Sequence, residues 1–309
     1  MNLIRAFCAA FVCLLMTTIA FAYDLPPVNL GYTNFLDAAP PPPGHGWYFI
    51  QYFSTYDSKE FTNSSGGRLG GVPSPDFNPA VLLSQGVYLS PKKLPVLNAH
   101  LGLDAIIPVV MSFNLQTPNA LGLKANSGGV GNPIVGPVLL WDPLMTHGRP
   151  IWFNYIELDN FIPVGKYNHH DQINPGPNFY SFLPFWSTTV MITPNWDFSS
   201  RLQYLRNTKN DTTGIRAGNA IFDNFSTSYQ VIPNRLRLGA AGYYLKQLNN
   251  SQGNPAPNSK EQVLGIGPGA LISLSPHTAI ILYDYVESHA ENRTRGNRFV
   301  FTFSQAFGP

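Results

Sequence analysis

The sequence predicts an all-β protein, an antiparallel up-and-down transmembrane β-barrel of about 12 strands in a bacterial outer membrane. Three observations support this fold. The chain begins with what looks like an export signal, it is poor in charge yet lacks a long apolar segment after that signal, and its expected connections alternate between long and short.

The first residues have the pattern of a signal peptide. Arg5 supplies the positive start, residues 6–21 are almost entirely apolar, and Ala20-Phe21-Ala22 is a small-x-small cleavage site. We therefore predict a signal peptide at 1–22. The alternative, an N-terminal membrane anchor, is disfavoured by the short apolar core. Cys8 and Cys13 lie inside this segment, so we expect a mature protein without disulfides, thiolate nucleophiles or cysteine metal sites.

Composition narrows the class further. Charged residues make up 12% of the chain, against about 25% in ordinary soluble domains, and aromatic residues make up 13%. After the signal there is no apolar run near the roughly 20 residues that a spanning helix needs. A closed barrel is the other structure that satisfies its backbone in lipid. The net charge is only +2 and no basic block occurs, so we expect no nucleic-acid partner.

The rest of the chain divides into a leader and a barrel. Residues 23–45 form a Pro-rich leader, expected on the periplasmic side, and residues 46–309 form the barrel. Segments with β-like patterns are expected at 46–56, 79–90, 96–108, 132–142, 149–163, 178–192, 195–207, 218–231, 235–248, 261–274, 277–289 and 297–307.

Alternation along these segments predicts which side chains face lipid. Leu101 and Leu103 share one face of 96–108, and His100 and Asp104 share the other. Segments 261–274 and 297–307 alternate in the same way, with apolar residues out and small or polar residues in, as in outer-membrane barrels. The side chains expected to face lipid are Leu101, Leu103, Leu264, Ile266, Phe301 and Phe303.

The connections predict the orientation. The long ones, rich in Gly, Asn, Ser and Pro, lie near 57–78, 109–131, 164–177, 208–217 and 249–260, followed by a shorter polar one at 290–296. Between them lie short, proline-containing turns at 90–93, 142–150, 193–195, 232–234 and 275–277. Outer-membrane barrels have long external loops and short periplasmic turns. Both termini and all five tryptophans then fall toward the periplasmic side; coincidental core aromatics would be the alternative for the tryptophans.

The inward faces predict a polar lumen with few charges. Such residues line a pore or form an interior network of ion pairs that closes the barrel, and the sequence leaves both possibilities open. The candidate lumen-lining residues are Asn98, His100, Asp104, Glu157, Asp159, Asp197, Arg201, Gln203, Arg235, Arg237, Gln247 and Glu287.

Motifs for chemistry are weak. His169-His170-Asp171 has no third spaced ligand and fits a solvated loop, and Gly265-x-Gly267-x-Gly269 has no helix after it and fits small inward residues on a strand. A barrel enzyme would need a serine, a histidine and an acid on the wall; His100, His277 and His289 could contribute, but nothing fixes their spacing. We expect no catalytic residues, no cofactor and no metal.

Several short stretches occur in a characteristic order and spacing along the chain. They are Pro163-Val164-Gly165-Lys166-Tyr167, Asn195-Trp196, Tyr204-Leu205-Arg206-Asn207, Gly239-Ala240-Ala241-Gly242-Tyr243-Tyr244-Leu245-Lys246-Gln247, Ile266-Gly267-Pro268-Gly269, Glu287 and Ala290-Glu291-Asn292. Together they resemble one family of outer-membrane proteins, the meta-pathway phenol-degradation family, which includes SphA-like transport proteins. The resemblance implies a transport barrel linked to the breakdown of aromatic compounds rather than a degrading enzyme.

Together these features predict passive uptake of small hydrophobic or aromatic compounds. A lumen of about 12 strands is narrower than that of 16–18-stranded porins, and the leader could enter it and narrow it further. The expected partners are outer-membrane lipid, the barrel assembly machinery and a small hydrophobic or aromatic solute. A closed structural barrel and an outer-membrane enzyme are the alternatives.

The orientation can be tested by proteolysis of intact cells. We expect cleavage within 57–78, because that loop is external, and protection of 90–95, which lies at a periplasmic turn. Cleavage confined to the short turns would show the inverse topology.

Overall fold

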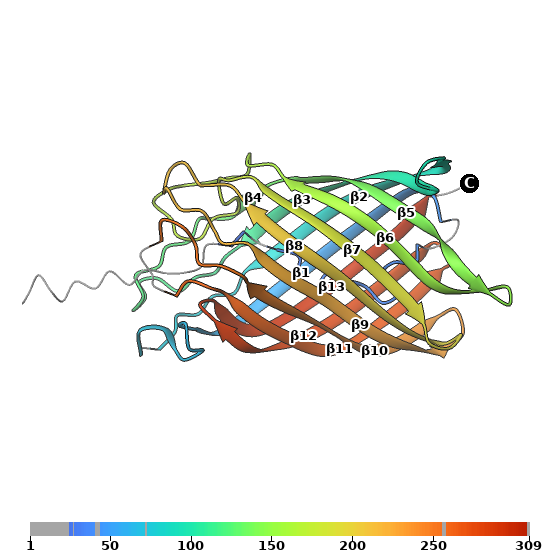
Figure 1. The fold of residues 1–309 in the computed structure, drawn as a ribbon. Coiled ribbons are helices and arrows are strands. Elements are labelled where there is room, and N and C mark those ends of the chain that lie inside the picture. The colour runs from blue at the N-terminus through green and yellow to red at the C-terminus, as the bar shows by residue number, and fades with distance from the viewer. Residues whose placement is uncertain (1–24, 27, 41–43, 72, 255–257, 308–309) are drawn as a thin grey trace, which may run out of the picture.

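Twelve long strands close into one antiparallel barrel in the computed structural model, which describes residues 25–26, 28–40, 44–71, 73–254 and 258–307 (Figure 1). The predicted fold class is therefore confirmed. The predicted signal peptide and residues 23–24, 27 and 41–43 of the leader lie outside the described residues. The strands are β1 (Gly46–Phe61), β2 (Ala80–Leu94), β3 (Ala99–Ser112), the two-residue β4 (Gly129–Val130), β5 (Ile134–Thr146), β6 (Arg149–Phe161), β7 (Ser181–Met191), β8 (Trp196–Asn207), β9 (Ala220–Ile232), β10 (Leu236–Gln247), β11 (Gln262–Ser275), β12 (Thr278–Glu291) and β13 (Thr294–Phe307).

Closure of the ring joins the two ends of the chain. β1 pairs with β13, with Trp47 opposite Phe307, and on its other side with β2, with Gly46 opposite Leu89. β2 then pairs with β3, and each following long strand pairs with the next, so the twelve long strands leave no free edge. The short β4 adds only two residue pairs to β3.

Helices contribute almost nothing. Within the described part of the chain the single helical turn is the 3-10 turn Leu69–Gly71, and no helix there is long and apolar enough to cross a membrane.

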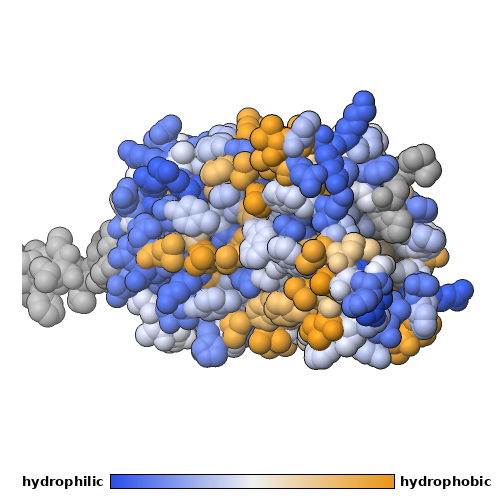
Figure 2. All heavy atoms as spheres, turned by 45° about the vertical axis from the view of Figure 1, so that its right-hand side comes forward, coloured by the Kyte–Doolittle hydropathy of each residue, from blue (hydrophilic) through white to orange (hydrophobic). Residues whose placement is uncertain are grey.

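The outer surface carries the apolar half of each alternating pattern. On β3, Leu101 and Leu103 are 42% and 53% exposed, whereas Asp104 is buried inside the barrel. The same period of two places Ile266 on the outer face of β11 and buries Val263. Figure 2 shows the result on one side of the molecule: hydrophobic side chains gather over the middle of the wall, and hydrophilic ones cover the end that carries the long loops.

Long loops and short turns occupy opposite ends of the barrel, as the connection lengths predict (Figure 1). Three of the connections that differ from the prediction are informative. The first turn is at 95–98 instead of 90–93, the second is reduced to 147–148, and the expected loop at 290–296 is a tight turn at 292–293.

Local backbone geometry explains these differences. Pro91 is accommodated within β2 by a register shift between Leu89 and Lys93, so proline there does not end the strand. The turns instead fall where residues adopt positive φ: Asn98 at 48°, His147 at 47° and Asn292 at 54°. Polar side chains of this kind tolerate the left-handed region better than most residues do.

A charge on the lipid-facing side of β3 tests the assignment of faces. Leu103→Arg should lower the free energy of unfolding by up to roughly 2–4 kcal/mol, because Leu103 is 53% exposed on the apolar outer wall, where an arginine must be taken from water. Leu103→Met is the matched control, since it keeps an apolar side chain of similar size. Urea unfolding in lipid vesicles measures the difference, and equal stability of the arginine variant would contradict the assignment.

Candidate functional site

The N-terminal segment, defined here as residues 25–40, runs inside the barrel. Leu30 and Ala38 are 1% exposed and Phe35 is 2% exposed. At one end the Leu25 amide donates to Glu261 Oε1, close to a long loop; at the other the Ala38 amide donates to Thr189 Oγ1, near the short turn that follows β7. The segment therefore extends along the length of the lumen, with Leu25 near the long loops, whereas the leader was expected to begin at the short-turn, periplasmic end (Figure 1, blue).

Polar side chains of β9 and β12 hold the main chain of this segment. Asn224 accepts a hydrogen bond from the Gly31 amide (3.2 Å) and donates one to the Asn29 carbonyl (2.6 Å). The hydroxyl of Tyr285 donates to the Gly31 carbonyl (3.1 Å), and that of Tyr283 accepts from the Phe35 amide (2.7 Å). A buried main chain must pair its amides and carbonyls, and here the barrel wall supplies the partners.

Glycines make the close approach possible. Gly31 has a φ of 79°, and a Cβ there would lie 2.8 Å from the ring of Tyr285. On β11, a Cβ at Gly265 or Gly269 would lie 2.4 Å from the ring of Tyr243 or Tyr283, respectively. The glycine repeat that superficially resembles a phosphate loop thus leaves room for tyrosines in the lumen.

One buried ion pair joins the segment to the wall. Arg201 on β8 binds Asp37 through two bonds, from Nε to Oδ2 (3.0 Å) and from Nη2 to Oδ1 (2.7 Å). Ser187 donates to the same carboxylate at 2.5 Å, and Arg201 Nη2 also donates to the Tyr155 hydroxyl at 2.8 Å. The Asp37 side chain is 1% exposed, so this paired, bidentate contact lies away from solvent.

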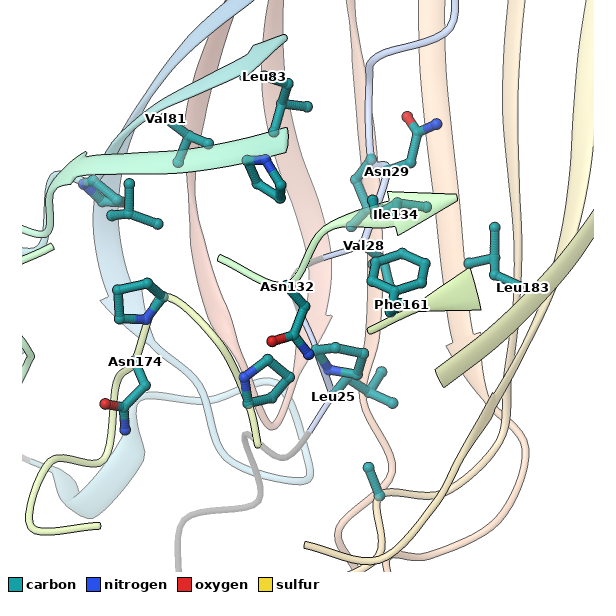
Figure 3. A pocket seen from close by; sticks show the side chains of 18 of the residues that line it. Leu25, Val28, Asn29, Val81, Leu83, Asn132, Ile134, Phe161, Asn174 and Leu183 are labelled. Atoms are coloured by element: carbon teal, nitrogen blue, oxygen red, sulfur yellow. The ribbon is translucent and has the colours of Figure 1, made fainter. Parts of the chain in front are cut away.

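A cavity of about 570 Å³ lies between the segment and the opposite part of the wall. Apart from Glu261 in the loop before β11, the polar bonds that hold the segment come from β7, β8, β9 and β12, whereas much of the cavity lining comes from β1, β2, β3 and β6. Figure 3 shows apolar side chains from both sides of this space, Leu25 and Val28 of the segment and Leu83, Ile134 and Phe161 of the wall.

Four of the predicted lumen residues line this cavity: Asp104, Glu157, Asp159 and Arg201. Each is buried. A carboxylate oxygen of each of Asp104, Glu157 and Asp159 lies within 4.8 Å of the others. The structure thus brings three acids from β3 and β6 together on the wall that faces the segment.

Other predicted lumen residues are held in networks of the wall. Arg237 Nη2 lies 3.0 Å from Asp197 Oδ1, and Ser228 donates to the same carboxylate. Glu287 accepts from the hydroxyls of Tyr56 (2.5 Å) and Tyr243 (2.7 Å). Both arrangements give a buried carboxylate its hydrogen-bond partners inside the protein, an arginine and a serine for Asp197 and two tyrosine hydroxyls for Glu287.

The two glutamines are also buried, and both are 1% exposed. Gln247 fastens the loop after β10, since its Nε2 donates to the Asn249 carbonyl (2.9 Å) and its Oε1 accepts from the Glu261 amide (3.1 Å). Gln203, on β8, has no hydrogen-bond partner for its side chain among the described residues.

The last three predicted lumen residues lie at the short-turn end. Asn98 and Arg235 are exposed in the turns before β3 and β10, so the structure places them outside the lumen. His100 is half-buried, and its ring nitrogens contact the Ser90 carbonyl (2.8 Å) and Asp142 Oδ1 (3.1 Å). Asn98 lies outside the lumen because the first turn is displaced, so that β3 begins at 99 and not at 96 as predicted.

The histidines do not gather into one site. His100 lies at the start of β3, next to the first short turn. His289 lies near the end of β12, at the opposite end of the barrel. His169 and His170 are both exposed in a long loop, where their rings contact each other at 3.7 Å between centroids.

Sequence reasoning missed several residues that shape the lumen. Asp37 is the clearest, because it was assigned only to the leader; a single acid within the otherwise uncharged residues 25–44 was the available signal. Tyr52 and Tyr56 alternate with outward residues on β1 and were open to the same period-two argument as the charged residues. Their size, together with that of Tyr155 on β6, narrows the lumen.

Comparison with known structures agrees with this fold. The COG4313 outer membrane channel from Pseudomonas putida F1 superposes with a TM-score of 0.75 at 13% sequence identity, covering 91% of this chain and 100% of the other. The β-domain of the Bordetella autotransporter BrkA gives 0.48 at 10% identity, covering 85% and 100%, a weak similarity that concerns barrel shape only. No curated protein matches the sequence.

A family model supplies the classification. The model described as "Putative MetA-pathway of phenol degradation" matches residues 58–303, which is most of the barrel. The closed ring of strands and the apolar outer wall are those of an outer-membrane protein. The chain belongs to this phenol-degradation family of outer-membrane barrels.

Proposed function

We propose that the protein is a passive channel of the outer membrane for small hydrophobic or aromatic compounds. The observation that carries this proposal is the largely apolar cavity of about 570 Å³ inside the barrel. Its volume falls within the roughly 300–1,000 Å³ typical of small-molecule sites, which are mostly apolar with a few polar groups.

The chemistry of the lining favours an apolar solute over a polar one. Leu83, Ile134 and Phe161 from the wall and Val28 from the segment border the cavity. General porins pass polar solutes through wide, water-filled lumens of 16–18 strands. A twelve-stranded lumen that also holds a chain segment is much narrower. The family description, with its link to phenol degradation, supports an aromatic solute.

A closed structural barrel is the competing function, and the contacts of the N-terminal segment are the observation that favours it. The segment is bonded to four strands, and its Asp37 is paired with Arg201 in the interior. Transport of a solute past the Asp37–Arg201 pair requires that the segment move or that a path remain open beside it. The cavity lies beside it, but the path also has to pass the edge-to-face contact of Tyr32 and Tyr52, whose ring centroids are 5.5 Å apart. It has to pass a buried cluster of inward side chains as well, formed by Tyr48, Leu89, Val138, Leu140 and Ala306. Contacts at both levels therefore have to open.

The role of the ion pair can be tested with a thiol reporter. In a Leu30→Cys protein, Asp37→Asn should speed modification by a maleimide about tenfold or more. Losing one partner of a buried pair costs roughly 3–5 kcal/mol, and about 1.4 kcal/mol corresponds to a factor of ten. Asp197→Asn is the matched control, because it breaks a lumen ion pair that does not touch the segment. Unchanged reactivity, or equal acceleration in the control, would show that Asp37 does not hold the segment.

Flux into proteoliposomes tests the function itself. Purified protein should accelerate uptake of a hydrophobic aromatic compound and leave uptake of a polar sugar unchanged. Ile134→Trp fills the cavity and should lower the aromatic flux several-fold, whereas Val135→Trp, on the outer face of the same strand, should not.

Two outcomes would replace the channel. If aromatic flux equals that of empty liposomes, the closed structural barrel is the better function. If flux is absent but the compound is chemically altered, the protein is an enzyme. In cells, deletion of the gene should slow growth on a hydrophobic aromatic carbon source at low concentration and leave growth on a polar one unaffected.

A further inference from the structure

Three acids meet on the wall of the cavity, although they come from distant parts of the sequence. Asp104 lies on β3, and Glu157 and Asp159 lie two residues apart on β6, so both point inward. One carboxylate oxygen from each lies within 4.8 Å of the other two. All three side chains border the cavity and are buried from bulk solvent.

The strand between them is shaped to let them meet. β5 lies between β3 and β6, and its residue opposite Asp104 is Gly136. A Cβ at Gly136 would lie 2.8 Å from Asp159 Oδ1. Because Gly136 has no side chain, the Asp159 carboxylate can lie over β5, on the side toward Asp104.

The carboxylates also have unused oxygens. Gln85 Nε2 donates to Asp104 Oδ2 at 2.7 Å, but Asp104 Oδ1 has no well-aligned hydrogen-bond donor among the described residues, and its side-chain neighbour there is the Glu157 carboxyl of the same cluster. Asp159 Oδ1 likewise has none there, and the two residues are only 1% and 5% exposed. A charged carboxylate that is buried without a partner is strongly unfavourable, so each of these carboxyl groups either takes up a proton or binds a positively charged ligand.

The neighbouring arginine is already engaged. Arg201 borders the same cavity, but its guanidinium bonds Asp37 through two nitrogens and the Tyr155 hydroxyl. While the N-terminal segment is in place, the three acids therefore outnumber the positive charge available to them, which is one arginine shared with Asp37. The counter-charge has to come from elsewhere.

We propose that Asp104, Glu157 and Asp159 bind a hard divalent cation, calcium or magnesium, on the cavity wall. Both ions take carboxylate and carbonyl oxygens together with water, and clustered oxygens without nitrogen or sulfur donors suit them. Gln85 is positioned as an outer partner, because its amide orients Asp104 while its Oε1 accepts from the Tyr52 hydroxyl at 3.0 Å. The site ties β3 to β6 across Gly136.

This cation site stands apart from transport. Metal binding would persist in a barrel that passes no aromatic compound, and a channel would remain a channel if the site bound only protons. The two proposals therefore fail separately: flux measurements leave the cation site untouched, and binding measurements leave the channel untouched.

The test uses the refolded full-length mature protein in detergent, stripped with EDTA. Terbium(III), which replaces calcium at oxygen sites, should bind and emit on tyrosine excitation, because Tyr52 lies one hydrogen bond from Gln85. Calcium or magnesium should displace it and should raise the unfolding temperature, as a ligand of the folded state must. Asp159→Asn and Glu157→Gln should each weaken terbium binding by at least the roughly 10–100-fold that loss of a second-shell partner costs.

Asp57→Asn is the control, because Asp57 is an exposed carboxylate on the same barrel. A difference in gel migration between unheated and heated samples (heat modifiability) establishes that each variant is folded. If Asp159→Asn does not fold, Asp104→Asn takes its place. Equal terbium binding by the wild type and the folded trio variants, or equal loss in Asp57→Asn, would overturn the proposal. An unfolding temperature that millimolar calcium and magnesium leave unchanged would also overturn it. The three carboxyl groups would then be neutralised by protons instead of a cation.

Discussion

The structure depends on one constraint, that main-chain amides and carbonyls removed from water must find partners. In the wall this forces closure, because a free strand edge in lipid would expose a row of unpaired groups. β1 meets this need by pairing with β13 on one side and β2 on the other. The same constraint acts on the N-terminal segment in the lumen, where no regular sheet can pair it. There the partners are side chains, among them Asn224, Tyr283 and Tyr285.

This need divides the lumen into two parts. The strands that carry amide and hydroxyl side chains at the right level hold the segment, and glycines such as Gly31 and Gly269 allow it to lie against them. The opposite wall carries apolar residues and tyrosines around the cavity. A passive path for an apolar solute and a firmly held segment are thus compatible, because they use different faces of the lumen.

Electrostatics in the lumen follows from which charges have partners. Asp197 and Glu287 are satisfied within the wall by Arg237 and by tyrosine hydroxyls, and such groups mainly stabilise the barrel. Arg201 lies at the boundary, between Asp37 of the segment and the acids of the cavity wall. Asp197 and Glu287 keep their partners whatever the lumen contains. Arg201 and the acids of the cavity wall can respond to a ligand, because their pairing changes when the segment or a cation moves.

The sequence by itself determined the barrel, because the features that specify it are local. A period of two along each strand assigned the faces, and alternating loop lengths assigned the ends. Turn positions were predicted less well, since Pro91 could stay within β2 and the chain turned later, at Asn98. Nine of the predicted lumen residues are buried, because inward direction is also a local property.

Tertiary structure alone decided what those residues do. Inward neighbours on different strands meet only through the stagger of the ring, which no single strand encodes. That stagger placed Asp104 beside Glu157 and Asp159, and placed Glu287 beside Tyr56 instead. It also gave Arg201 a partner in Asp37, a residue 164 positions away in a segment without any strand pattern. Contacts between remote segments depend on the curvature and register of the closed barrel, and these become defined only when all twelve strands have paired.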